Sequence, residues 1–248
     1  MKILLSGLYG HMGREVYQLT RETYKDCEIT AGIDLNSDGS IPVPCFTSFR
    51  EVTGDFACIV DFSHHSLTEA LTAFAVAKKC PLVIATTGQT PEEHALIKDA
   101  ALQIPVFFAA NYSLGIAVLS KIAQTVVRAM PEAEIEIIEA HHDRKLDAPS
   151  GTALALASAI QKIRPECETR LGRSGAGKRT KNEIGIHAVR MGNIVGIHEI
   201  IIGTPNQTIT LKHEAHDRAL FAEGALAAAR FITNQPAGFY TMQELLAE

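Results

Sequence analysis

The feature that most constrains the fold is the rhythm of the first 110 residues. Short apolar runs, rich in β-branched residues, lie at 2–6, 27–34, 57–62, 82–86 and 106–110, and they alternate with helical segments such as 67–79 and 91–102. This alternation predicts β-α units, in which parallel strands are buried between helices. We therefore expect an α/β protein with a Rossmann-like, doubly wound parallel sheet.

The pattern changes after residue 112. A strand pattern at 134–142 leads into a helix after Pro149, and three candidate strands then follow at 183–190, 196–203 and 207–215 with little helix between them. This succession predicts a second α+β domain with a mixed or antiparallel open sheet. Segment 217–232 is helical by its 3.6-residue apolar period, and we expect it to return to the first domain. The predicted domains are 1–111 with 217–248, and 112–216.

Composition excludes several classes of protein. No apolar run approaches the roughly 18 to 20 residues that cross a bilayer, and the opening residues are too short for a signal peptide, so we expect a cytoplasmic protein. The five cysteines contain no C-x-x-C pair, which argues against a disulfide scaffold and a zinc site. A net charge of −5 offers no general attraction to nucleic acid or to an anionic membrane, and only segment 172–181 forms a local basic patch.

The stretch "KILLSGLYGHMGREV" has the form of a strand, a glycine turn and a helix start, with Gly7, Gly10 and Gly13 in G-x-x-G-x-x-G spacing. Such a turn suits a dinucleotide pyrophosphate at the helix N-terminus, although a tight turn without a ligand is the alternative. Asp34 follows about 20 residues later, where an acid can bind the adenosine ribose, or can simply initiate a turn. Because Leu35 replaces a phosphate-binding arginine, we expect NADH to be favoured about tenfold to a hundredfold over NADPH.

A second group of polar residues lies in "HHDRKLDAPSGTAL". His141 and His142 would point to opposite sides of a strand, so they suit separate roles better than a shared metal, and we expect no metal site. A histidine can act as a general acid, Lys145 adds a positive charge, and Pro149–Thr152 places backbone N–H donors at a helix start. The stretch predicts a site for a small anion; a solvated loop before an ordinary capped helix is the alternative.

Eight motifs are spread over nearly the whole chain: "GLYGHMGR", "DFS", "ATTGQT", "AANYSLGI", "EAHHDRKLDAPSGTAL", "EIGIHAVR", "IVGIHEI" and "FAEGALAAARFI". In these motifs and in their order, the chain resembles the 4-hydroxy-tetrahydrodipicolinate reductase (dihydrodipicolinate reductase) family of the diaminopimelate route to lysine. The string from His141 to Thr152 is the most specific of them. The chain departs from the family's usual residues at His65, Ala85, Met191 and Ile197.

The resemblance implies NAD(P)H-dependent reduction of a cyclic imine dicarboxylate by a homotetramer, with the second domain binding substrate and forming the oligomer. It implies that His141 and Lys145 are the catalytic acids, either of which could deliver the proton, and that the substrate is bound by His142, Ser150, Gly151 and Thr152. The residues that it assigns to the cofactor are Gly7, Leu8, Tyr9, Gly10, His11, Met12, Gly13, Asp34, Ala85, Thr86, Thr87, Ala109, Ala110, Asn111 and Tyr112.

Two other hypotheses remain open. Another two-domain dehydrogenase acting on a small anion is possible, although a semialdehyde dehydrogenase needs an activated cysteine, and the five cysteines have no partner motif. The second hypothesis is a catalytically silent protein that senses NAD(H). The presence of both His141 and Lys145 argues against this hypothesis. The remaining histidines near strands and turns are assigned no role in the chemistry: His64, His65, His94, His187, His198, His213 and His216.

Overall fold

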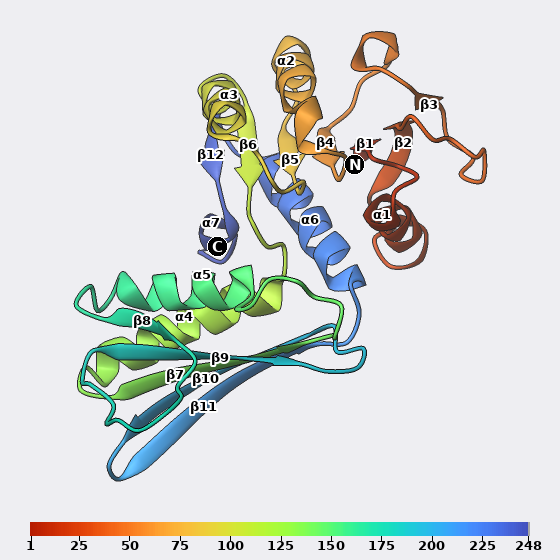
Figure 1. Cartoon of the computed structure of the whole chain (residues 1–248). Helices are drawn as coiled ribbons and strands as arrows, with labels where there is room; N and C mark the ends of the chain where they lie inside the picture. Colours follow the sequence, from red (N-terminus) through yellow and green to blue (C-terminus); the bar gives the residue numbers. More distant parts are fainter. Residues whose placement is uncertain (248) are drawn as a thin grey trace. The chain divides into compact units, whose positions relative to one another are not determined.

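The computed structural model describes residues 1–247 and divides the chain into two compact units (Figure 1). Unit 1 comprises Met1–Ser113 and the chain from Ala219 onward, and unit 2 comprises Leu114–Arg218. Along residues 1–247, no helix combines the length and the apolar character that crossing a membrane requires.

Unit 1 contains a sheet of seven strands in the order β12-β6-β5-β4-β1-β2-β3, with every neighbouring pair parallel. The strands are β1 (Lys2–Ser6), β2 (Glu28–Ile33), β3 (Cys45–Phe46), β4 (Cys58–Asp61), β5 (Leu82–Ile84), β6 (Pro105–Phe108) and β12 (Gly238–Tyr240). The predicted Rossmann-like sheet is confirmed. Its strand order reverses at β1, because β2 and β4 pair with opposite edges of that strand.

Two layers of helices cover this sheet. One contains α2 (Thr68–Lys78) and α3 (Pro91–Ala101), whose buried residues share a core with Leu4 and Ile59. The other contains α1 (His11–Glu22) and α6 (Ala219–Ile232), and Phe231 of α6 packs edge-on against Phe107 of β6 at a centroid distance of 6.1 Å. The short elements are α7 (Met242–Leu245) and the 3-10 turns η1 (Phe49–Glu51) and η2 (His65–Leu67). Buried apolar residues on both faces of the strands explain why the sequence reads as nearly continuous hydrophobic runs.

Unit 2 contains a sheet of five strands in the order β11-β10-β7-β9-β8. The strands are β7 (Glu134–His141), β8 (Glu168–Leu171), β9 (Glu183–Arg190), β10 (Gly196–Thr204) and β11 (Gln207–Ala215). Strand β10 pairs antiparallel with β7 and β11, whereas β9 pairs parallel with β7 and β8. The predicted mixed sheet is therefore confirmed.

The two helices of unit 2, α4 (Leu114–Ala129) and α5 (Gly151–Gln161), pack on the same face of this sheet (Figure 1). The alternation of β7 shows why: Ile135 and Ile137 are buried under the helices, while Glu136 and Ile138 on the opposite face are half-buried. No helix among the described residues of unit 2 lies on that opposite face.

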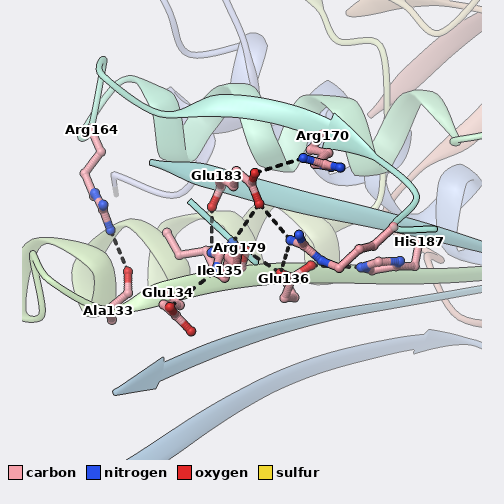
Figure 2. A network of polar contacts seen from close by, with 10 residues as sticks. Ala133, Glu134, Ile135, Glu136, Arg164, Arg170, Arg179, Glu183 and His187 are labelled. Carbon is pink, nitrogen blue, oxygen red and sulfur yellow. Dashed lines mark hydrogen bonds and ion pairs between the residues drawn. The ribbon is translucent and has the colours of Figure 1, made fainter. Parts of the chain in front are cut away.

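The basic segment 172–181 lies in the loop between β8 and β9, and both of its arginines are paired inside unit 2. Figure 2 shows Arg179 among the carboxylates of Glu134, Glu136 and Glu183. Arg173 lies 2.8 Å from Glu183 and 3.4 Å from Glu136, and Arg179 lies 3.3 Å from Glu136. His187 contacts the same Glu136 at 2.8 Å. The hydrogen bond from Arg173 holds the pKa of Glu183 at about 2. The charges of these two arginines are thus balanced locally.

Candidate functional site

The turn between β1 and α1 is shaped by its glycines. Gly7 has a φ of +82°, and a Cβ at this residue would lie 2.6 Å from the carbonyl oxygen of Phe62. A Cβ at Gly13 would lie 2.0 Å from the carbonyl oxygen of Gly7, so the first turn of α1 packs closely against the glycine turn. Gly10 caps α1 with no side-chain hydrogen bond. The helix therefore begins with uncapped N–H groups where the strand order reverses, which fits a pyrophosphate.

Asp34 follows β2 and is joined to this turn. Its Oδ2 accepts a hydrogen bond from the backbone N–H of Tyr9 at 2.8 Å, and its Oδ1 accepts one from Asn36 at 2.9 Å. The second bond is the turn contact that the alternative interpretation required. Each carboxylate oxygen can accept a further hydrogen bond, so a ribose hydroxyl can still bind here. Leu35 is 76% exposed, so no positive charge stands beside Asp34 at this position.

Several residues assigned to the cofactor direct their side chains into the protein. Thr86 Oγ1 donates to Asp61 Oδ2 at 2.6 Å, and the Tyr112 hydroxyl donates to the Ile84 carbonyl oxygen at 2.7 Å. Leu8 is fully buried. Burial raises the pKa of Asp61, a residue that the sequence analysis did not single out. The side chains of Leu8, Thr86 and Tyr112 therefore contact protein groups. Only the backbone groups of these residues remain available to bind a cofactor.

The remaining cofactor candidates follow strands of the same sheet. Segment 11–13 forms the first turn of α1 after β1, segment 85–87 follows β5, and segment 109–111 follows β6. Because all these strands are parallel, their carboxyl ends lie at one edge of the sheet. The topology of unit 1 thus brings segments that are far apart in the sequence to one edge.

In unit 2, the end of β7 carries His141 in a buried network around Glu139. His141 Nδ1 lies 2.6 Å from Glu139 Oε2, and Ser150 donates its backbone N–H to Glu139 Oε1 at 2.9 Å. Arg190, from β9, donates one N–H to each oxygen of the same carboxylate, at 2.8 and 2.7 Å. The Glu139 side chain is fully buried. A charge held this deeply is tolerated because every side of the carboxylate is hydrogen-bonded.

This network sets the charge states of the site. Burial alone would raise the pKa of Glu139, but the hydrogen bonds from Arg190, His141 and Ser150 outweigh burial and lower it. The pKa of His141 is lowered, first by burial and further by the nearby charges of Lys145 and Arg190, against the opposing effect of Glu139. Glu139 is therefore ionised and His141 is mainly neutral at neutral pH in the free protein.

The other predicted substrate residues lie just beyond β7. Lys145 Nζ pairs with Asp147 Oδ1 at 2.8 Å, and Lys145 in turn lowers the pKa of Asp147. His142 is anchored by its backbone N–H to the Ile194 carbonyl oxygen at 2.8 Å, while its Nδ1 is buried with no hydrogen-bond partner among the described residues. A Cβ at Gly151 would meet nothing within 4 Å, so the space beside the first residue of α5 is open.

Ser150 has a different environment. It is buried, its Oγ accepts a hydrogen bond from the N–H of Ala153 and thereby caps α5, and it lies 3.1 Å from His198 Nε2. Its side chain thus contacts protein groups, and its position supports the start of α5. His198 also packs edge-on against His141, with ring centroids 5.1 Å apart.

Three residues of this network were not predicted from the sequence: Glu139, Arg190 and His198. Glu139 could have been found, because it precedes His141 by two positions on a strand and so lies on the same face. Burial lowers the pKa of His198 to about 4, which keeps its ring neutral. His198 is thus a buried, partnered histidine, and it lies directly beside the predicted site.

Residues 1–112 match the family model described as dihydrodipicolinate reductase, N-terminus, and residues 115–246 match the model described as dihydrodipicolinate reductase, C-terminus. The chain belongs to the dihydrodipicolinate reductase family. The resemblance stated from the sequence motifs is therefore confirmed.

Relatives and solved structures agree with this membership. Proteins named 4-hydroxy-tetrahydrodipicolinate reductase from Caldanaerobacter subterraneus subsp. tengcongensis and from Clostridium tetani are each 41% identical over 248 residues, covering 99% of this chain and 98% and 97% of theirs. A dipicolinate-bound dihydrodipicolinate reductase from Paenisporosarcina sp. TG-14 superposes with a TM-score of 0.80 at 25% identity, covering 97% of each chain. An aspartate dehydrogenase from Thermotoga maritima, at 15% identity and a TM-score of 0.53 over 93% of this chain and 96% of its own, shares the fold.

Proposed function

We propose that this member of the dihydrodipicolinate reductase family reduces 4-hydroxy-tetrahydrodipicolinate to tetrahydrodipicolinate in the diaminopimelate route to lysine. It is an NAD(P)H-dependent oxidoreductase. The observation that carries the proposal is the group formed by His141, Lys145 and the open start of α5 at Gly151, in a chain that matches the family over nearly its whole length.

The substrate class follows from charge. Lys145 supplies a cation, and the start of α5 supplies backbone donors and the positive end of a helix dipole, which together suit the carboxylates of a small cyclic imine. A substrate carboxylate would have to compete with Asp147 for Lys145. In this proposal His142, Ser150, Gly151 and Thr152 form the substrate-binding region, with Ser150 acting through the helix cap that it provides.

The proposed mechanism has two parts. The bound nicotinamide would supply a hydride, and the glycine turn and Asp34 are the residues that would hold its pyrophosphate and ribose. The electron pair passed into the conjugated imine must be met by a proton. The charge of Lys145 acts on His141 and lowers its pKa, and His141 can carry that proton on Nε2, because its Nδ1 is engaged with Glu139. Lys145 would stabilise the developing negative charge.

We assign dinucleotide binding to residues 1–111 and 217–248, and substrate binding and oligomerisation to residues 112–216. A homotetramer is proposed because one face of the unit 2 sheet carries half-buried Ile138 and Ile201 without a covering helix among the described residues of that unit. Light scattering of the purified protein tests this: we expect the mass of four chains for the wild type and a smaller species for Ile201→Glu. A monomeric wild-type protein would contradict the assignment.

The preference between NADH and NADPH is proposed from Asp34 and Leu35. A 2′-phosphate would meet the negative charge of Asp34, and Leu35 offers it no cation, so we expect NADH to be preferred over NADPH. The proposed partners of the protein are this cofactor, the dicarboxylate substrate and further copies of the chain. We place the protein in the cytoplasm and propose no binding to nucleic acid or to a membrane.

A coupled assay tests the function. The substrate is generated from pyruvate and aspartate semialdehyde with the preceding synthase, the protein is added, and consumption of NADH and of NADPH is followed in separate reactions. Rapid oxidation is expected, and the ratio of the two rates tests the role of Asp34 and Leu35. If NADH binds but neither cofactor is consumed, the protein acts as an NAD(H) sensor or on another small anion.

A further inference from the structure

We propose that Glu139 is the positioning residue of this reaction: it determines which ring nitrogen of His141 carries the proton and directs the other nitrogen toward the reacting centre. The inference rests on the proposed function of His141 and extends it to a residue that does not touch the substrate. Because the Glu139 side chain is fully buried, it can act only through the groups that contact it.

The hydrogen-bond inventory decides the tautomer. An ionised carboxylate can only accept hydrogen bonds, and the contacts of Glu139 are the Ser150 N–H, two N–H groups of Arg190 and His141 Nδ1. At 2.6 Å, His141 must therefore present a proton on Nδ1. In the neutral ring this leaves Nε2 with the free lone pair, ready to take up and deliver the proton that catalysis requires.

Arg190 keeps the carboxylate ionised and fixed. Its guanidinium binds both oxygens of Glu139, and the parallel pairing of β7 with β9 places it directly beside His141 in the register. Glu139 and His141 lie two residues apart on β7, so they share one face of the sheet. The imidazole is thus oriented by a carboxylate that is itself held by a neighbouring strand.

Gly196 lies beside the other nitrogen of the imidazole. It begins β10, and a Cβ at this residue would lie 3.2 Å from His141 Nε2. Glu139 and Gly196 therefore act on opposite nitrogens: one anchors Nδ1, and the other leaves room beside Nε2. The edge contact of His198 further limits rotation of the ring.

The wild-type protein provides the first test. Nitrogen-15 NMR of the imidazoles at neutral pH, without substrate, distinguishes an N–H nitrogen from one with a free lone pair, and His141→Gln identifies the signal of His141. We expect Nδ1–H. An Nε2–H tautomer would overturn the proposal, and this result does not depend on whether the assigned reaction is correct.

Glu139→Gln provides the second test, because an amide can donate as well as accept and no longer imposes one tautomer. We expect a changed tautomer distribution and a fall in kcat on the order of 10²- to 10⁴-fold, the contribution of a general acid, with the Kd for NADH within about twofold of the wild type. Glu183→Gln is the matched control. It removes another buried carboxylate held by arginines, outside the proposed site, and should retain the wild-type tautomer and kcat.

An unchanged tautomer in Glu139→Gln, or a kcat equal to that of the Glu183→Gln control, overturns the proposal. If Glu139→Gln does not fold, the NMR measurement on the wild-type protein decides, because an Nε2–H tautomer of His141 overturns the proposal without any variant of Glu139. Failure of the proposed function gives a different result, namely an inactive wild-type protein that still shows the Nδ1–H tautomer.

Discussion

His198 should make the stability of unit 2 depend on pH. The native structure holds this ring in its neutral form with a pKa of about 4, whereas the unfolded chain takes up the proton near the ordinary value of 6.5. The difference corresponds to about 3 kcal/mol of folding free energy, at about 1.4 kcal/mol for each pH unit between the two values. This stability is fully present above pH 6.5 and is lost as the pH falls toward 4, with about 2 kcal/mol gone at pH 5.

Urea unfolding followed by circular dichroism at pH 7.5 and pH 5.0 measures this loss. We expect the free energy of unfolding to fall by about 2 kcal/mol more in the wild type than in His198→Gln, whose side chain cannot titrate. Ser150→Ala is the control. It removes the contact with His198 and the cap of α5, so it should cost about 1 kcal/mol at both pH values while retaining the pH dependence that burial causes.

The same fall in wild-type protein and in His198→Gln would refute this reasoning. It would mean that burial of His198 does not account for the acid sensitivity. His141, whose pKa is also lowered, titrates in both proteins, and its charge is one of the causes that lower the pKa of His198, so the measured difference includes this coupling.

Three further predictions concern the site itself. Lys145→Ala should abolish turnover while leaving NADH binding nearly intact, as measured by fluorescence titration, and near-normal turnover would remove Lys145 from the mechanism. Gly13→Ala should weaken NADH binding by at least about tenfold, which corresponds to the loss of one charge-assisted hydrogen bond. The reason is that the added Cβ would lie 2.0 Å from the Gly7 carbonyl oxygen and displace the turn. Gly10→Ala is the matched variant, because its Cβ would lie 3.3 Å from the same Gly7 oxygen, and we expect a smaller loss of NADH affinity. Equal losses of affinity in the two variants would contradict the packing argument. Finally, kcat/KM should fall as the pH rises through the lowered pKa of His141, because the protonated ring is the acid, and this limb should be absent in His141→Gln.

The local patterns of the sequence were sufficient to predict the main architecture, a parallel sheet in one unit and a mixed sheet in the other. Strands of the first sheet are buried on both faces and therefore read as continuous apolar runs, and the helices that cover them follow a 3.6-residue period. The glycine turn, Asp34 and the string from His141 to Thr152 were likewise found because each lies within one short stretch. Short strands such as β3, with two residues, and β12, with three, escaped prediction because they span too few positions to show a period.

The network behind His141 depended on the tertiary structure. Arg190 is 51 residues from Glu139, and His198 is 48 residues from Ser150. They meet because β7 pairs with β9 on one side and with β10 on the other, although neither strand follows it directly along the chain in a hairpin. A local pattern specifies that a segment is a strand and which side chains share a face, whereas its partner strands and register depend on packing of the whole sheet. The sequence therefore determined which residues could perform the chemistry, and only the packed sheet decided which buried groups hold them in place.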